Sequence, residues 1–341
     1  MKKILAIETS CDDTAVAVIN EQGQILGNAI YTQVHEYARY GGVVPEIGSR
    51  AHIEQILCTT KLALKKACLE ISAIDVVAAT IAPGLVGPLL VGANFAKGLA
   101  LSLNIPFVGV HHIRGHVLAG LSEPDFPKPP FIALIASGGH SALYQCDKNY
   151  RISLIGETLD DAAGEAFDKI GRALGLGYPA GKKMDELARL GDASRFKLPI
   201  AMRKESHFNF SFSGLKTEAI RCIREQNPFN EQSLKDLCAS VECAISQALC
   251  ERTLRAAQEK NIKNIVIGGG VAANTGLRHT IKSQCDTLGI SLYLPPKELC
   301  TDNAVMIARA ALIELKDGRV SSLATDVKAT LPVEQADALV Q

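Results

Sequence analysis

His112 and His116 are the residues whose types and spacing most directly indicate chemistry in this sequence. Side chains four residues apart lie on one face of a helix, so the two imidazoles can converge on a single metal ion. The segment differs from the HExxH motif of zinc proteases, because Ile113 stands where that motif has its glutamate general base. The sequence therefore predicts a metal site that is not a protease site and that takes a third ligand from elsewhere in the chain.

Asp302 is the candidate for that third ligand, because its carboxylate is a hard oxygen donor. It stands just before residues 304–315, whose apolar pattern predicts a helix. An aspartate at this place is equally typical of a helix N-cap, whose side chain accepts hydrogen bonds from the first turn. The sequence alone leaves both roles open.

Glycine-rich turns follow two predicted strands and indicate a nucleotide. Residues 137–139 follow one strand, and residues 268–270 follow another and precede a helix that is expected from about Asn274. A third such turn lies at residues 83–87. Without side chains in the way, the N–H groups of these turns can face phosphate oxygens. Neither the Walker pattern GxxxxGK[ST] nor a GxGxxG after the first strand occurs.

Carboxylates cluster in two places. Asp12 and Asp13 lie in the turn after the first predicted strand, and a second acidic run spans residues 160–169. Turn carboxylates that face a cleft suit ribose hydroxyls, a metal or a proton in transit. The second run is amphipathic, and a solvated helix face is the simpler interpretation of it.

Composition indicates a well-packed globular protein. The 341 residues, 47% of them apolar and 21% charged, exceed what one hydrophobic core usually organises, so two domains are expected. The 36 basic and 36 acidic residues cancel, so global charge does not indicate a nucleic-acid partner. Residues 195–225 hold seven basic and three acidic residues among four phenylalanines. That segment fits either a basic surface for a polyanion or a solvated surface over buried rings.

The sequence predicts a cytoplasmic protein without a membrane segment. The apolar stretch at residues 4–7 is too short for a secretory signal. No uninterrupted apolar run reaches the roughly 18 residues of a membrane span. Ten cysteines without a CxxC pair are expected to be reduced thiols.

The chain repeats one pattern of elements. Strands are predicted at 4–8, 14–19 and 25–31, and again about 127 residues later at 131–136, 141–146 and 151–157. Helices are predicted at 52–68, 93–103 and 160–174. The repeat predicts an α/β protein with two domains of one topology around a cleft, joined near the proline-rich residues 124–130. The first domain is expected to span 1–128, completed by a C-terminal helix at about 302–325, and the second to span 129–301.

Ordered motifs along nearly the whole chain resemble one family, the bacterial TsaD tRNA threonylcarbamoyladenosine transferases, formerly described as glycoproteases. The matching motifs are ETSCD (8–12), GGVVPE (41–46) with SR (49–50), PGLVG (83–87), His112 with GH (115–116), SGGH (137–140), DDAAGEAFDK (160–169), FSFSGLKT (210–217), GGV (269–271) with Asn274, and CTDN (300–303). The resemblance implies the actin-like ATPase fold, with two ribonuclease-H-like domains around a central cleft.

The resemblance also implies site residues. His112, His116 and Asp302 match the metal ligands of the family, for iron or zinc. A second set matches positions that hold the nucleotide or threonylcarbamoyl-AMP: Ile135, Ala136, Ser137, Gly138, Gly139, Asp168, Gly181, Asp185 and Asn274.

The reaction that the resemblance implies is transfer of the threonylcarbamoyl group from threonylcarbamoyl-AMP to N6 of the adenosine 3′ to the anticodon, with release of AMP. The tRNAs are those that read codons beginning with adenine. Implied partners are a scaffold paralogue of the TsaB type and a small ATPase of the TsaE type. We add the hypothesis that Asp12 or Asp13 accepts the proton lost by the attacking amine.

The chain departs from the family in three places. Arg114 and Asp13 stand where the family commonly has Glu, and residues 178–182 read YPAGK where it commonly reads YPGGP. These differences concern the surroundings of the metal and of the sugar-binding loop. Two rival functions are a small-molecule kinase or carbamoyltransferase of the same fold and a non-enzymatic scaffold paralogue. The paired histidines argue against a kinase and against the scaffold.

Overall fold

Two compact units make up the structure, a computed structural model that describes residues 1–33, 37, 44–225 and 229–341. One unit is Met1–Phe126 together with Asp302–Gln341, and the other is Pro127–Thr301. The chain thus passes between them within the proline-rich residues 124–130. Residues 41–43 of the GGVVPE motif lie outside the described residues.

A mixed five-stranded sheet forms the centre of the first unit. Its strands are β1 (Lys3–Glu8), β2 (Asp13–Asn20), β3 (Ile25–Thr32), β4 (Val76–Ala82) and β5 (Phe107–His111). They lie in the order β3-β2-β1-β4-β5; β1 and β3 are antiparallel to β2, whereas β1, β4 and β5 are parallel. Because parallel strands end at the same edge of a sheet, the carboxyl ends of β1, β4 and β5 lie along one edge.

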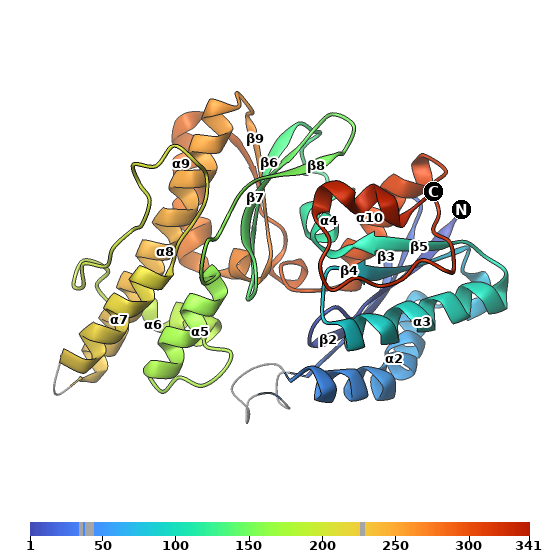
Figure 1. Cartoon of the computed structure of the whole chain (residues 1–341), viewed down its shortest axis with the longest axis horizontal. Helices are drawn as coiled ribbons and strands as arrows, with labels where there is room; N and C mark the ends of the chain where they lie inside the picture. Colours follow the sequence, from blue (N-terminus) through green and yellow to red (C-terminus); the bar gives the residue numbers. More distant parts are fainter. Residues whose placement is uncertain (34–36, 38–43, 226–228) are drawn as a thin grey trace. The chain divides into compact units, whose positions relative to one another are not determined.

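Helices cover both faces of this sheet. They are α2 (Pro45–Ala67), α3 (Val86–Leu103), α4 (His112–Val117) and α10 (Ala304–Lys316), with the short 3-10 helices η1 (Ile71–Ala73) and η4 (Val333–Leu339). Figure 1 shows α2 and α3 on one side of the sheet and α10 on the other. Strands with both faces covered are expected to be apolar throughout, and every residue of β4 is buried.

The second unit repeats the topology of the first. Its strands are β6 (Phe131–Ala136), β7 (Ser141–Cys146), β8 (Ile152–Glu157), β9 (Asn264–Gly268) and β10 (Ser291–Tyr293). Their order, β8-β7-β6-β9-β10, and their directions match those of the first sheet strand for strand. The repeat predicted from the sequence is therefore confirmed.

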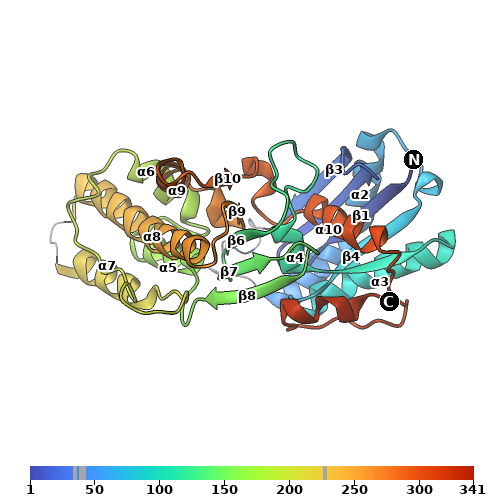
Figure 2. The same cartoon turned by 90° about the horizontal axis from the view of Figure 1, so that it is seen from above.

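Helices of the second unit pack around one long helix, α8 (Glu231–Glu259). The helices are α5 (Ala163–Ala173), α6 (Gly181–Ala188), α7 (Ser213–Glu225), α8 (Glu231–Glu259) and α9 (Thr275–Leu288), with the 3-10 helices η2 (Gly270–Ala273) and η3 (Lys297–Leu299). Helix α8 packs on β6 and β9 and contacts α6, α7 and α9. It runs through the middle of the helical layer (Figure 2).

Some helix starts differ from the sequence prediction. Helices α2 and α3 begin earlier than expected, at Pro45 and Val86. Their first turns contain proline and glycine, which mask the apolar period but are tolerated there because the first N–H groups need no helical partner. Helix α5 begins at Ala163 and not at Asp160, because the Asp160 side chain instead binds the start of α7.

Helix α3 is the one helix in the described part of the chain that is long and apolar enough to cross a membrane, by length and composition only. It packs against β1, β4 and α2. Lys97 on this helix donates a hydrogen bond to the carbonyl of Thr325. These contacts hold α3 against the sheet of the first unit.

Leu134 of β6 is a fully buried member of the hydrophobic core of the second unit. We expect Leu134→Ala to lower the free energy of unfolding by about 2–5 kcal/mol, because it removes buried carbon atoms and leaves a cavity. Leu154→Ala is the control: this side chain of β8 is 37% exposed, so the loss is expected below about 1 kcal/mol. Denaturant unfolding of both variants measures the difference, and equal losses would contradict the prediction.

Candidate functional site

The paired histidines lie at the edge where β5 ends. Strand β5 stops at His111, and α4 begins with His112, so the chain turns from strand to helix at the first histidine. The imidazoles of His112 and His116 are both buried, and their ring centroids are 4.7 Å apart. The segment is therefore helical, as convergence of the two imidazoles requires.

Asp302 lies against both imidazoles. Its Oδ1 atom is 3.0 Å from Nε2 of His116 and 3.6 Å from Nε2 of His112. The N-cap of α10 is Asn303, whose side chain accepts a hydrogen bond from the N–H of Met306, so the N-cap interpretation of Asp302 is wrong.

The geometry of these three side chains fits a metal ion. One ligand atom from each lies within 4.8 Å of the others, and no other group of this kind occurs in the part of the chain that the structure describes. Two ligands at about 2.0–2.1 Å from a tetrahedral zinc ion are about 3.3 Å apart, close to the distances from Asp302 to the imidazoles. Two imidazoles and a carboxylate suit either zinc or iron.

Glu8 supports this group, although the sequence analysis assigned it no role. It ends β1, is fully buried, and accepts hydrogen bonds from Thr80 and from the N–H of Ser10. Its Oε2 atom is 3.0 Å from Nδ1 of His112. Because a carboxylate only accepts, Nδ1 carries the proton and Nε2 is left as the ligand atom. The signals in the sequence were its place in the ETSCD motif (8–12) and its position at the end of an otherwise apolar strand.

Electrostatics keep both partners of this contact charged when no metal is bound. Burial opposes ionisation of Glu8, but the charge and hydrogen bond of His112 lower the pKa of its carboxyl. Burial likewise opposes protonation of His112, but the carboxylates of Asp302 and Glu8 raise its pKa to about 9. The site therefore concentrates negative charge around the imidazoles, which favours a cation.

The turn that carries Asp12 and Asp13 lies beside the same group. The hydroxyl oxygen of Ser10 is 3.0 Å from Nδ1 of His112. Burial, followed by the carboxylate of Asp302, raises the pKa of Asp12. Burial and the charge of Asp12 raise the pKa of Asp13 to about 7. A carboxylate with a pKa near neutrality is suited to act as a general base.

His52 of α2 clamps this turn, although no sequence motif singled it out. Its Nε2 is 3.1 Å from the carbonyl oxygen of Cys11, and its Nδ1 is 2.7 Å from the hydroxyl of Thr14. Since a carbonyl only accepts, Nε2 carries the proton and Nδ1 accepts from Thr14. Burial lowers the pKa of His52, so the ring stays neutral. Its two contacts flank the two aspartates.

Arg114 points away from the metal group. It is two residues from each histidine, which directs its side chain to another face of α4. The buried guanidinium pairs with Glu314 of α10 at 3.1 Å and with Asp337 of η4 at 3.1 Å, and Arg319 contacts the same two carboxylates. Arginine at this position thus fastens the metal-binding helix to the C-terminal segment.

The candidate nucleotide turns lie side by side in the second unit. Strands β6 and β9 are parallel neighbours, with Ile135 opposite Gly268, so the turns that follow both strands lie at one edge. A Cβ atom on Gly138 would meet no neighbour within 4 Å. Gly269 has a φ of +86°, and a side chain there would overlap the carbonyl of Ala136. Glycine is therefore required where the two turns touch.

The remaining polar side chains of the nucleotide set accept hydrogen bonds from N–H groups at the starts of α6 and α9. Asp168 accepts hydrogen bonds from the N–H groups of Ala180 and Gly181, at the start of α6. Asp185 of α6 accepts from the N–H of Thr275, and Asn274 is the N-cap of α9. Asp185 and Asn274 therefore meet at the start of α9.

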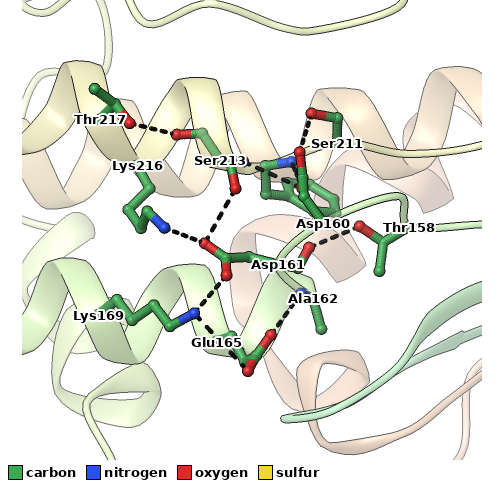
Figure 3. Close-up of polar contacts among 11 residues, drawn as sticks. Thr158, Asp160, Asp161, Ala162, Glu165, Lys169, Ser211, Ser213, Lys216 and Thr217 are labelled. Atoms are coloured by element: carbon green, nitrogen blue, oxygen red, sulfur yellow. Dashed lines mark hydrogen bonds and ion pairs between the residues drawn. The ribbon is translucent and has the colours of Figure 1, made fainter.

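The predicted acidic run and the predicted basic segment bind each other (Figure 3). Asp161 pairs with Lys169 and Lys216, and Asp160 accepts hydrogen bonds from Ser211 and from N–H groups at the start of α7. Three of the seven basic residues of the segment pair with carboxylates: Arg203, Lys216 and Arg221. The acidic pair thus fastens the loop before α5 to α7. The solvated face expected for this run is found on α5 itself, where the side chains of Glu165 and Lys169 are 46% and 42% exposed.

Comparison with known proteins identifies a family. A model of the TsaD family, described as tRNA N6-adenosine threonylcarbamoyltransferase, matches residues 24–309. A protein of that name from Caldicellulosiruptor saccharolyticus is 45% identical over 324 residues, which cover 95% of this chain and 96% of that protein.

Solved structures show the fold. HypF from T. kodakarensis is similar with a TM-score of 0.63 and 14% identity, over 92% of this chain and 48% of that one. Component A of (R)-2-hydroxyglutaryl-CoA dehydratase from Acidaminococcus fermentans is similar with a TM-score of 0.54 and 15% identity, over 93% of this chain and 100% of that one. The actin-like ATPase fold predicted for this α/β chain is confirmed.

The contact between Glu8 and His112 is open to a direct test. Glu8→Gln removes the charge that supports the basicity of His112, so we expect the affinity for Zn²⁺ or Fe²⁺ to fall about 10- to 100-fold. Competition with a chromogenic chelator measures the affinity, and circular dichroism checks the fold. Glu70→Gln, at an exposed position, is the control and is expected to bind as the wild type does. Equal affinity in the Glu8→Gln variant would contradict the role of Glu8.

Proposed function

The chain belongs to the TsaD family of tRNA N6-adenosine threonylcarbamoyltransferases, and we propose on that premise how its residues carry out the transfer. It is an enzyme that transfers a threonylcarbamoyl group to N6 of an adenosine in tRNA, which is its substrate. We propose that the donor is threonylcarbamoyl-AMP and that the acceptor is the adenosine 3′ to the anticodon. In the reaction a bond forms between N6 and the carbamoyl carbon, the bond from that carbon to the AMP oxygen breaks, and N6 loses a proton.

His112, His116 and Asp302 are the proposed ligands of one metal ion, iron or zinc. The observation that carries this proposal is the approach of two buried Nε2 atoms to a single carboxylate oxygen, at 3.0 and 3.6 Å. When bound, the ion supplies a Lewis acid for oxygens of the substrate. Glu8 fixes the proton of His112 on Nδ1 and so orients the ring.

Residues at the ends of β6 and β9 are proposed to hold the AMP part of the donor. The open space around Gly138 and Gly139 supports this role, because their N–H groups can then approach phosphate oxygens closely. The full proposed set is Ile135, Ala136, Ser137, Gly138, Gly139, Asp168, Gly181, Asp185 and Asn274. Donors that hold the leaving phosphate stabilise the charge that develops on it as the bond breaks.

Asp12 or Asp13 is proposed to accept the proton that N6 loses. The pKa of Asp13, raised to about 7 by burial and by Asp12, supports this role because such a group is both ionised and basic near neutral pH. The hydrogen bonds of His52 on either side of the two aspartates hold the turn still.

A scaffold paralogue of the TsaB type is proposed to bind the surface formed by α2 and α3. Helix α2 exposes Ile53 and Leu57, and α3 exposes Val86 and Leu90, each pair spaced by four residues. Helices α2 and α3 pack against each other. Apolar side chains exposed on adjacent helices are typical of a surface that a partner covers. We further propose a small ATPase of the TsaE type as a second partner. The proposed location of the protein is the cytoplasm.

The proposed metal ligands are tested in a transfer reaction. The chain and its two partners are incubated with threonylcarbamoyl-AMP and unmodified tRNA, and the modified nucleoside is measured by mass spectrometry. His112→Ala and His116→Ala are each expected to lose the metal and to form less than about 1% of the product, because a loss of about 2.7 kcal/mol of stabilisation corresponds to 100-fold. His279→Ala, at an exposed histidine outside the proposed sites, is expected to retain both. Full product from a metal-free double variant would refute the mechanism.

The proposed base is tested separately. Asp12→Asn combined with Asp13→Asn is expected to slow single-turnover transfer about 10²- to 10⁴-fold while metal content is kept, since amides cannot take the proton. The rate of the wild type is expected to rise with pH through about 7 as Asp13 ionises. Asp12→Asn alone lacks the neighbouring charge that helps to raise the pKa of Asp13, so its rate is expected to rise at a lower pH. An unchanged rate in the double variant would exclude both residues as the base.

A further inference from the structure

Glu242 lies between two residues of the proposed nucleotide set without belonging to it. It is part of α8, which contacts both α6 and α9. Helix α6 carries Asp185, and Asn274 caps α9. The Glu242 side chain contacts both of them, so a single carboxyl group from the central helix joins two ligand-binding elements.

The contact with Asn274 fixes the orientation of its amide. Oε1 of Glu242 accepts a hydrogen bond from Nδ2 of Asn274 at 2.6 Å. The other end of the amide, Oδ1, accepts from the N–H of Leu277 at 2.8 Å and so caps α9. With Glu242 as the acceptor, the nitrogen of Asn274 faces α8 and its oxygen faces the helix.

The contact with Asp185 requires a proton. The carboxyl groups of Glu242 and Asp185 interact: besides the effect of burial on both, this contact lowers the pKa of Asp185 and raises that of Glu242. Two carboxyl groups can share a hydrogen bond only if one of them is protonated. Asp185 is already the acceptor for the N–H and the hydroxyl of Thr275 and for Arg189. Glu242 is therefore the member that holds the proton and donates it to Asp185.

Little in the surroundings compensates a second negative charge. Among the residues that the structure describes, the cation that acts on Glu242 is Arg189, the C-cap of α6, and it is already paired with Asp185. On its own helix, Glu242 is near the thiols of Cys238 and Cys243, and α9 contributes the neutral amide of Asn274. A side chain on Gly276 would overlap the Glu242 carboxyl, so the first turn of α9 packs directly on it.

We propose that Glu242, in its protonated form, is a positioning residue that holds Asn274 and Asp185 in the geometry that binds the AMP part of the substrate. The inference rests on the proposed nucleotide site. In it, the proton shared by Glu242 and Asp185 joins α6, α8 and α9 into one support. Loss of that proton leaves two adjacent carboxylates that repel each other and loosens the start of α9.

This role makes the second unit sensitive to pH. Burial and the neighbouring Asp185 raise the pKa of Glu242 to about 7, above the ordinary glutamate value that it has in the unfolded chain. A carboxyl whose pKa is raised by folding binds its proton more tightly in the folded state. Its contribution to stability is complete below the unfolded pKa and is lost as the pH rises through about 7.

The shared proton is tested by unfolding. In Glu242→Gln the side-chain oxygen can still accept from Asn274, and the amide nitrogen can donate to Asp185 at every pH. We expect the melting temperature of the wild type to fall relative to that of Glu242→Gln between pH 5 and pH 8. Glu231→Gln, which replaces an exposed glutamate of α8, is expected to follow the wild type. If the melting temperatures of the wild type and Glu242→Gln changed in parallel with pH, the proposal of a shared proton would be refuted.

The positioning role is tested by AMP binding, measured by calorimetry from pH 6 to pH 9. The quantity compared is the dissociation constant of the wild type divided by that of Glu242→Gln. Because protonation of AMP affects both constants equally, it does not change this ratio. We expect this ratio to be flat below about pH 6.5 and to rise toward tenfold per pH unit above about pH 7.5. Glu242→Leu, which leaves the amide of Asn274 without its acceptor, is expected to weaken binding at every pH. A ratio independent of pH would overturn the positioning role.

The two experiments separate this inference from the proposed function. If neither folded protein bound AMP at any pH, the proposed nucleotide site would be refuted, and the positioning role with it. The shared proton would still be supported by a difference in the unfolding curves. If AMP bound equally well to all variants, the nucleotide site would stand and the role of Glu242 would be refuted.

Discussion

The contact between Glu8 and His112 is the interaction on which the metal group depends. It joins residues 104 positions apart in the sequence, at the ends of β1 and at the start of α4. A buried carboxylate without a partner costs several kcal/mol, so Glu8 is tolerated only because His112, Thr80 and Ser10 surround it. The same contact leaves Nε2 of His112 as the ring nitrogen that can bind a metal, and Asp302 lies beside that nitrogen.

The parallel strands explain why chemistry gathers where it does. In each unit the central strand and the two strands on one side of it are parallel, and the strand on its other side is antiparallel to both of its neighbours. In the first unit the edge at which these strands end carries Glu8 and the paired histidines, and in the second it carries two glycine turns. One topology thus presents polar side chains in one unit and bare backbone in the other. Side chains suit a cation, whereas backbone N–H groups suit phosphate.

Ion pairs and hydrogen bonds outside the candidate sites hold the elements that carry these edges in place. Arg114 fastens α4 to α10 and η4, and Asp160 with Asp161 fastens the loop before α5 to α7. Each connects an element next to a candidate site with one that is distant in sequence. Glu242 acts in the same way between α6 and α9, with a proton in place of a cation. Rigid support of this kind is what a site needs to hold its ligands in a fixed geometry.

The sequence by itself determined the repeat, the strands, the family and the types of residue that make each candidate site. Apolar period and glycine position are local properties, and His112 with His116 is a local spacing on one helix. Tertiary structure decided what depends on contacts between distant segments. It showed that Asn303, and not Asp302, is the N-cap of α10, and that Glu8 contacts His112. It also joined Glu242 to Asp185 and Asn274, 57 and 32 residues away in the sequence. No local pattern encodes such pairs, because the free energy of a buried polar group depends on which partner the fold brings to it.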